Sequence, residues 1–188
     1  AVSAPAPPSS RNGDAPNAPA IDPRSTVAAA AVRRRIRVRP AISKSGAAPI
    51  TSGLSHAWAY PDHFNDDFRE QAKRARAGVE VDLTVRFDEY RKAATDDTVT
   101  IAFGGKARLS GLWVDDQYVA DYVRAHPDKL IGFLSVDPTQ PGWQDELRFG
   151  HQELKLEGIK LLPMYAGFRP DDALLDPLWE YATQHRLP

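Results

Sequence analysis

The chain has 188 residues, with 24 Lys and Arg against 25 Asp and Glu and a formal net charge of −1. This length suffices for one domain with a hydrophobic core, and the near-neutral charge predicts neither a nucleic-acid partner nor binding to a membrane surface. The absence of cysteine excludes disulfides and thiolate metal sites, and no apolar run approaches the roughly 20 residues that span a bilayer. The absence of cysteine does not fix the compartment; we expect a cytoplasmic protein.

Residues 1–48 are dominated by Ala, Pro, Ser and Arg. Such a segment has too little large apolar surface to offset the entropy of ordering it, so we predict a disordered leader. Its basic stretch, Val32–Arg39, has two interpretations: a nucleic-acid or targeting arm, or an unstructured leader that is either low-complexity sequence or translated from outside the true reading frame. We favour the second interpretation, because basic runs alone are weak signals.

From residue 49 to residue 94 the sequence predicts a first strand near residues 50–58, followed by more polar elements. Asn65–Ala77 is typical of a helix, with Asn65 as N-cap and a glycine after its end. Val79–Phe87 alternates apolar and polar residues, which predicts a strand with one exposed face. Asp88–Ala94 indicates a further helix. His63, in the loop before the first helix, suits either a solvated residue or a substrate contact.

A buried strand is predicted at Val99–Phe103, and Gly104, Gly105 and Lys106 follow it. Glycines at this point allow the backbone to approach a ligand, and Lys106 then supplies a positive charge for substrate binding. Ordinary turn chemistry is the alternative explanation. A helix capped by Asp115 or Asp116 ends before Pro127.

Two apolar runs, Leu130–Val136 and Ile159–Leu162, flank a segment with helical periodicity. In that segment Trp143, Leu147, His151 and Leu154 share one helical face. Two buried strands joined by a helix predict a right-handed parallel βαβ unit, and therefore an α/β fold. Enzymes of this class place their chemistry in the loops at the carboxyl ends of the strands. A last helix is predicted from Asp176, with Asp176 as N-cap.

Three strings carry a resemblance to a known family: HPDKLIGFLSVDP (126–138), GIKLLPMYAGFRPDD (158–172) and LDPLWEYATQHRLP (175–188). In this order they closely resemble the amidohydrolase-related family of metal-dependent (β/α)8-barrel hydrolases and decarboxylases. The resemblance implies that residues 49–188 form a partial TIM-type barrel, with about strands 1–4 and their helices. It also implies that the chain stops just before a fifth strand that would deliver a metal-binding histidine.

The metal motif of the family departs from its pattern in this chain. The family carries His-x-His in its first strand, where side chains at i and i+2 share a face and grip one metal. The matching residues are Leu54, Ser55 and His56, so His56 is a candidate metal ligand and Leu54 is not. An ordinary polar role for His56 is the alternative. Lys160 matches a strand-four lysine that, in some superfamily members, is carboxylated and bridges two metals; the alternative is an interior lysine paired with a carboxylate.

The resemblance also implies a function. Tyr165 and Phe168, in the loop after the fourth strand, would contact a small-molecule substrate or seal the barrel rim. The full-length enzyme would hold a divalent metal, with zinc the expected ion, whereas we expect no cofactor in this fragment. We expect the fragment of a metal-dependent hydrolase, inactive as truncated. A decarboxylase of the same family and a non-catalytic binding or assembly module are the alternatives, and homo-oligomerisation is left open.

Overall fold

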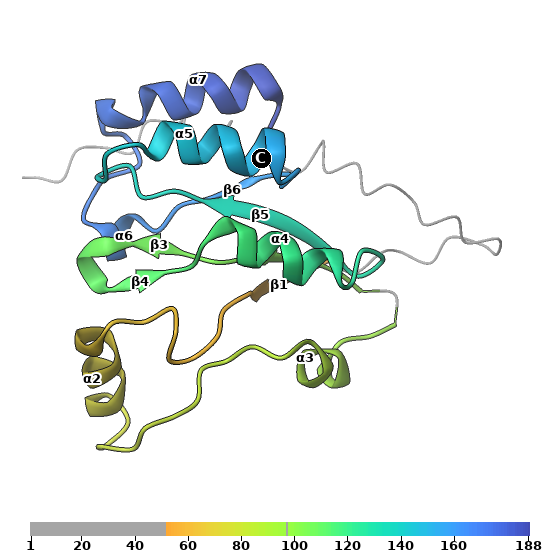
Figure 1. Cartoon of the computed structure of the whole chain (residues 1–188), viewed down its shortest axis with the longest axis vertical. Helices are drawn as coiled ribbons and strands as arrows, with labels where there is room; N and C mark the ends of the chain where they lie inside the picture. The colour runs from red at the N-terminus through yellow and green to blue at the C-terminus, as the bar shows by residue number, and fades with distance from the viewer. Residues whose placement is uncertain (1–51, 97) are drawn as a thin grey trace, which may run out of the picture. The chain divides into compact units, whose positions relative to one another are not determined.

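The computed structural model describes residues 52–96 and 98–188 (Figure 1). The predicted leader, residues 1–48, lies outside these residues. Within them, no helix combines the length and the apolar composition that a bilayer span requires.

Strands and short helices alternate along the chain (Figure 1). In order they are β1 (Ser52–His56), α2 (Asp66–Arg74), α3 (Phe87–Ala93), β2 (Val99–Phe103), β3 (Lys106–Ala107), β4 (Leu112–Trp113), α4 (Asp116–Arg124), β5 (Leu130–Ser135), α5 (Trp143–Arg148), β6 (Ile159–Lys160), α6 (Pro163–Ala166) and α7 (Asp176–His185).

The main sheet has four parallel strands in the order β1-β2-β5-β6. Each strand pairs with the next one in sequence among these four, which is the order that a (β/α) barrel requires of its first strands. The predicted α/β class with a parallel sheet is therefore confirmed. The described strands form an open sheet, and barrel closure stays a prediction. A separate hairpin, β3–β4, follows β2.

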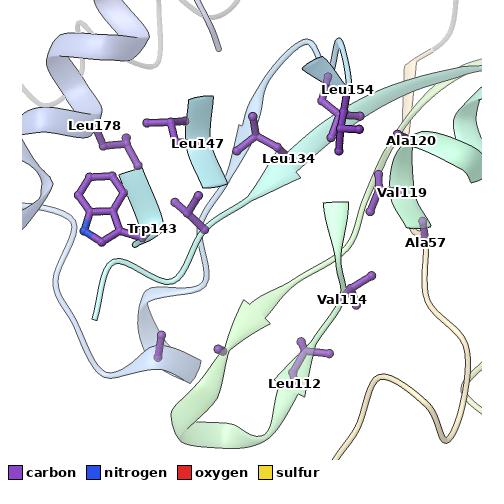
Figure 2. Close-up of a cluster of buried hydrophobic side chains, with 14 of the residues drawn as sticks. Ala57, Leu112, Val114, Val119, Ala120, Leu134, Trp143, Leu147, Leu154 and Leu178 are labelled. Carbon is purple, nitrogen blue, oxygen red and sulfur yellow. The ribbon is translucent and has the colours of Figure 1, made fainter. Parts of the chain in front are cut away.

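Helices cover one face of this sheet. A Cβ placed on Gly132 of β5 would meet Val123 of α4 at 3.2 Å, and one placed on Gly150 would meet Leu134 Cβ at 3.0 Å. Because paired positions of parallel strands point to the same side, Ala102 and Leu134 face these helices. Figure 2 shows the resulting apolar cluster.

The predicted buried strand at residues 99–103 and the N-cap Asn65 are confirmed, whereas the predicted N-cap Asp176 is wrong: Asp176 is the first residue of α7, Leu175 precedes it, and no side chain caps this helix. The Asn65 side chain accepts a hydrogen bond from Phe68 N at 2.8 Å at the start of α2, and β2 spans the predicted Val99–Phe103.

Several elements are shorter than predicted: α2 ends at Arg74, β5 at Ser135 and β6 at Lys160. α5 ends at Arg148, where a π-helical turn over Phe149–Glu153 follows.

The strand predicted at Val79–Phe87 is wrong. Residues 79–86 are irregular, and Val79 is 60% exposed. Their backbone contacts the loop after β1 instead of a sheet: Val85 N donates to Trp58 O at 3.1 Å, and Trp58 Nε1 donates to Leu83 O at 2.8 Å. Alternation alone does not form a strand where no neighbouring strand offers a ladder of hydrogen bonds.

Shortening a side chain on the sheet face that contacts the helices tests the packing of this core. Leu134 is 0% exposed, so we expect Leu134→Ala to lower the free energy of unfolding by about 2–5 kcal/mol. Leu109 is 75% exposed, and the matched Leu109→Ala should change it by no more than about 0.5 kcal/mol. Urea unfolding followed by circular dichroism measures both values; equal effects of the two variants would contradict the described packing.

Candidate functional site

Three side chains meet at the carboxyl ends of β1, β2 and β6: His56, Phe103 and Lys160. His56 and Phe103 are paired in register, and their rings meet edge to face with centroids 5.0 Å apart. Lys160 Nζ lies 4.9 Å from the centroid of the Phe103 ring. Phe103 thus forms a platform shared by an imidazole and a cation, on the sheet face opposite to the covering helices.

The protonation of His56 follows from these surroundings. The imidazole is half-buried and stacks on Trp58 with centroids 3.9 Å apart. Burial, and secondly the positive charge of Lys160, lower the pKa of His56 below its ordinary value of 6.5. His56 is therefore neutral at pH 7, the state in which an imidazole accepts a proton or binds a metal.

His56 does not complete a metal site with its described neighbours. Leu54, two residues earlier on the same strand, is 72% exposed and offers no ligand atom. In residues 52–96 and 98–188 no three His, Cys, Asp or Glu side chains lie together so as to hold a metal ion. Since a tight zinc site takes three or four protein ligands, the described residues do not fit the metal that the resemblance implies.

The carboxylate of Asp137, directly after β5, is occupied by hydrogen bonds within the chain. It is fully buried and accepts hydrogen bonds from Arg108 N at 2.8 Å, Thr139 N at 3.0 Å and Thr139 Oγ1 at 2.7 Å. Three of about four acceptor positions of a carboxylate are thus used within the chain. Asp137 organises the loops at this edge of the sheet.

Lys106 is buried rather than open to a ligand. Its Nζ lies 2.9 Å from Asp116 Oδ2 and 2.9 Å from Glu146 Oε2, and only 4% of its side chain is exposed. The predicted positive charge after β2 is present, but two carboxylates of the same chain neutralise it.

The two aromatic residues predicted in the loop after the fourth strand separate in the structure. Phe168 is buried in the hydrophobic cluster, whereas Tyr165, at the end of α6, is 50% exposed. Of the two, Tyr165 is the one whose ring remains accessible to a ligand.

The other histidines lie apart from His56. His126, after α4, stacks on Phe87 with centroids 3.5 Å apart, and His151 and His185 surround Tyr181 on the π-helical turn and α7. His151 and His185 are thus helical, whereas His126 lies just beyond the end of α4.

A pocket of about 240 Å³ lies between the loop after β1 and the hairpin after β2, and its lining includes His63, Arg108 and Trp113. Of these three residues, the sequence indicated only His63 as a possible substrate contact. His63 is 45 residues from Arg108 and 50 from Trp113, and the hairpin, which the sequence did not predict, brings them together.

Comparison with known proteins adds one finding. A family model described as amidohydrolase matches residues 53–188. No curated protein and no solved structure matches the chain.

The influence of Lys160 on His56 can be measured directly. Because burial is the larger cause of the lowered pKa, we expect Lys160→Met to raise the pKa of His56 while leaving it below 6.5. Titration of the histidine Cε1–H resonances by NMR gives the value. Lys155→Met is the matched control: Lys155 acts on His151 and should leave His56 unchanged. An unaltered His56 pKa in Lys160→Met would contradict the described cluster.

Proposed function

Because the chain belongs to the amidohydrolase family, we propose that it serves the hydrolysis of a small organic substrate. The observation that carries this proposal is the cluster of His56, Phe103 and Lys160 at the carboxyl ends of parallel strands. This edge is where α/β enzymes of the barrel class assemble their active sites.

Each member of the cluster has a role that its chemistry supports. His56, neutral at pH 7, accepts a proton from the attacking water or binds an electrophile. The Lys160 ammonium stabilises negative charge that develops on the substrate carbonyl oxygen. Phe103 fixes the spacing of the two groups and shields them from water on one side.

The family resemblance also predicts a divalent metal, with zinc the expected ion. Of the histidines in the described residues, His56 is the one at the carboxyl end of a sheet strand, and it belongs to no group of three ligating side chains there. We therefore assign roles only to the side chains described above.

A non-catalytic binding or assembly module is the second candidate, and Leu54 favours it. A leucine in place of the first family histidine removes half of the first-strand motif while keeping the βα framework. A decarboxylase is a variant of the main proposal, because it would use the same fold and the same edge of the sheet.

The test of function uses the protein expressed from the complete gene, with a panel of small esters, amides, lactones and carboxylic acids. We expect hydrolysis, and we expect His56→Ala to lower kcat/KM by about 100-fold, the effect of losing a positioned proton acceptor. His126→Ala, which changes a histidine beyond the C-terminal end of α4, should retain the native value. Carbon dioxide release without hydrolysis would replace the hydrolase with the decarboxylase, and no turnover of any kind would favour the binding module.

Zinc retention by the 188-residue chain is a separate prediction. After dialysis we expect well below one zinc per chain by elemental analysis, because His56 lacks the two or three further ligands of a tight site. Leu54→His adds only one ligand, two residues away on the same face, and should not raise retention to one. One zinc per chain that is lost in His56→Ala would overturn this account of the site.

A further inference from the structure

The pocket between the loop after β1 and the hairpin after β2 has fixed walls. Asn65 N donates to Gly111 O at 2.8 Å, and Trp113 N donates to His63 O at 3.0 Å. The Asn65 side chain also fills the space beside Gly111, where an added Cβ would meet its Oδ1 at 1.9 Å. Backbone contacts on both sides therefore hold the two loops at one separation.

Arg108 presents an unpaired guanidinium on one wall of this pocket. Within residues 52–96 and 98–188 no carboxylate forms an ion pair with it, whereas Arg69, Arg86 and Arg124 each pair with an aspartate. The guanidinium carbon lies 3.9 Å from the centroid of the Trp113 ring, so a cation–π contact orients its plane.

His63 supplies a second donor. Its Nδ1 accepts a hydrogen bond from Ala59 N at 2.8 Å, so in the neutral ring Nε2 carries the proton. Burial lowers the pKa of His63 more than Asp62 and Asp115 raise it, which keeps the ring neutral at pH 7. The neutral imidazole is thus a hydrogen-bond donor through Nε2.

A planar fork of donors matches the two oxygens of a carboxylate. At about 240 Å³ the pocket is smaller than the usual 300–1,000 Å³ of sites for drug-sized ligands, so it suits one small group. We propose that this pocket binds the carboxylate of a small organic acid, with Arg108 as the bidentate donor and His63 as the second donor. This proposal names a class of ligand, small carboxylic acids. It rests on the proposed hydrolase function only in so far as the bound acid is taken to be the substrate.

Asp62 also lines the pocket and is exposed. Its negative charge opposes an anionic ligand, which keeps binding weak. Neutralising it should therefore tighten binding, an effect opposite in sign to that of changing Arg108.

Binding is tested without turnover, by NMR of the indole N–H resonances of the four tryptophans in the 188-residue chain. Trp113→Phe identifies the resonance of the tryptophan that lies under Arg108. We expect sodium malonate to shift this resonance saturably, while malonamide and sodium chloride at equal ionic strength do not. Arg108→Met should weaken malonate binding at least about 10-fold, and Arg108→Lys less, because lysine keeps the charge and loses the fork.

Two further variants complete the design. Arg124→Met, which removes an arginine paired with Asp121 on α4, should bind malonate as the native chain does, and Asp62→Asn should bind it more tightly. Unchanged indole resonances of the other tryptophans show that each variant is folded. Equal malonate binding by native and Arg108→Met, or equal shifts with malonamide, would overturn the proposal; failure of hydrolysis alone would leave this binding result standing.

Discussion

One buried cation links the loops at the carboxyl edge of the sheet. Lys106, in the hairpin after β2, pairs with Asp116 at the start of α4 and with Glu146 on α5. Burial by itself lowers the pKa of Lys106, but the charges of the two carboxylates and their hydrogen bonds outweigh it and raise the pKa above its ordinary value. Breaking such a pair by removing one partner costs about 3–5 kcal/mol, a large part of the 5–15 kcal/mol that stabilises a typical domain. Lys106 therefore stays charged and couples a loop to both crossover helices.

The same network reaches the remaining strands through Ser135. Asp116 Oδ1 accepts a hydrogen bond from Ser135 N at 2.9 Å. Ser135 Oγ accepts one from Lys106 N at 3.1 Å and donates to Lys160 O at 3.1 Å. Because Lys160 carries the ammonium above Phe103, the buried ion pairs fix the backbone of a residue in the candidate site. A chain of satisfied polar groups of this kind rigidifies its surroundings, since any one unpaired member would be costly.

Elements with one dominant local cause were predictable from the sequence. Val99–Phe103 and Leu130–Ser135 are short apolar runs bounded by breakers, and both form central strands. Val79–Phe87 carried a strand pattern as clear as theirs, but a strand also needs a partner, and partners lie far away in sequence. In α5 the predicted apolar stripe is present as far as Leu154, which is buried, but its last part lies on a π-helical turn and not on the α-helix.

The part of the candidate site that lies at the carboxyl ends of the parallel strands was predictable from the sequence. His56 and Lys160 both end parallel strands of one sheet, so the topology places them at the same edge. They end the two outer strands, however, and only the structure shows that the Lys160 side chain reaches Phe103 across β5. The hairpin after β2 shows where such reasoning stops. Lys106 Nζ and the Arg108 guanidinium lie 5.6 Å and 3.9 Å from the centroid of the same Trp113 ring, and the sequence favoured Lys106 as the ligand-binding cation.

What separates the two cations is the position of their acidic partners. Asp116 and Glu146, 10 and 40 residues beyond Lys106, come within hydrogen-bond distance of its amino group. For Arg108, the buried Asp137 accepts a hydrogen bond from the backbone N–H, whereas no carboxylate of the described residues forms an ion pair with its guanidinium. A buried carboxylate thus anchors the main chain of Arg108 while its side chain remains unpaired within the described residues. An anchored main chain and a stacked guanidinium lose less entropy when a ligand binds, which makes Arg108, rather than Lys106, the cation suited to recognition.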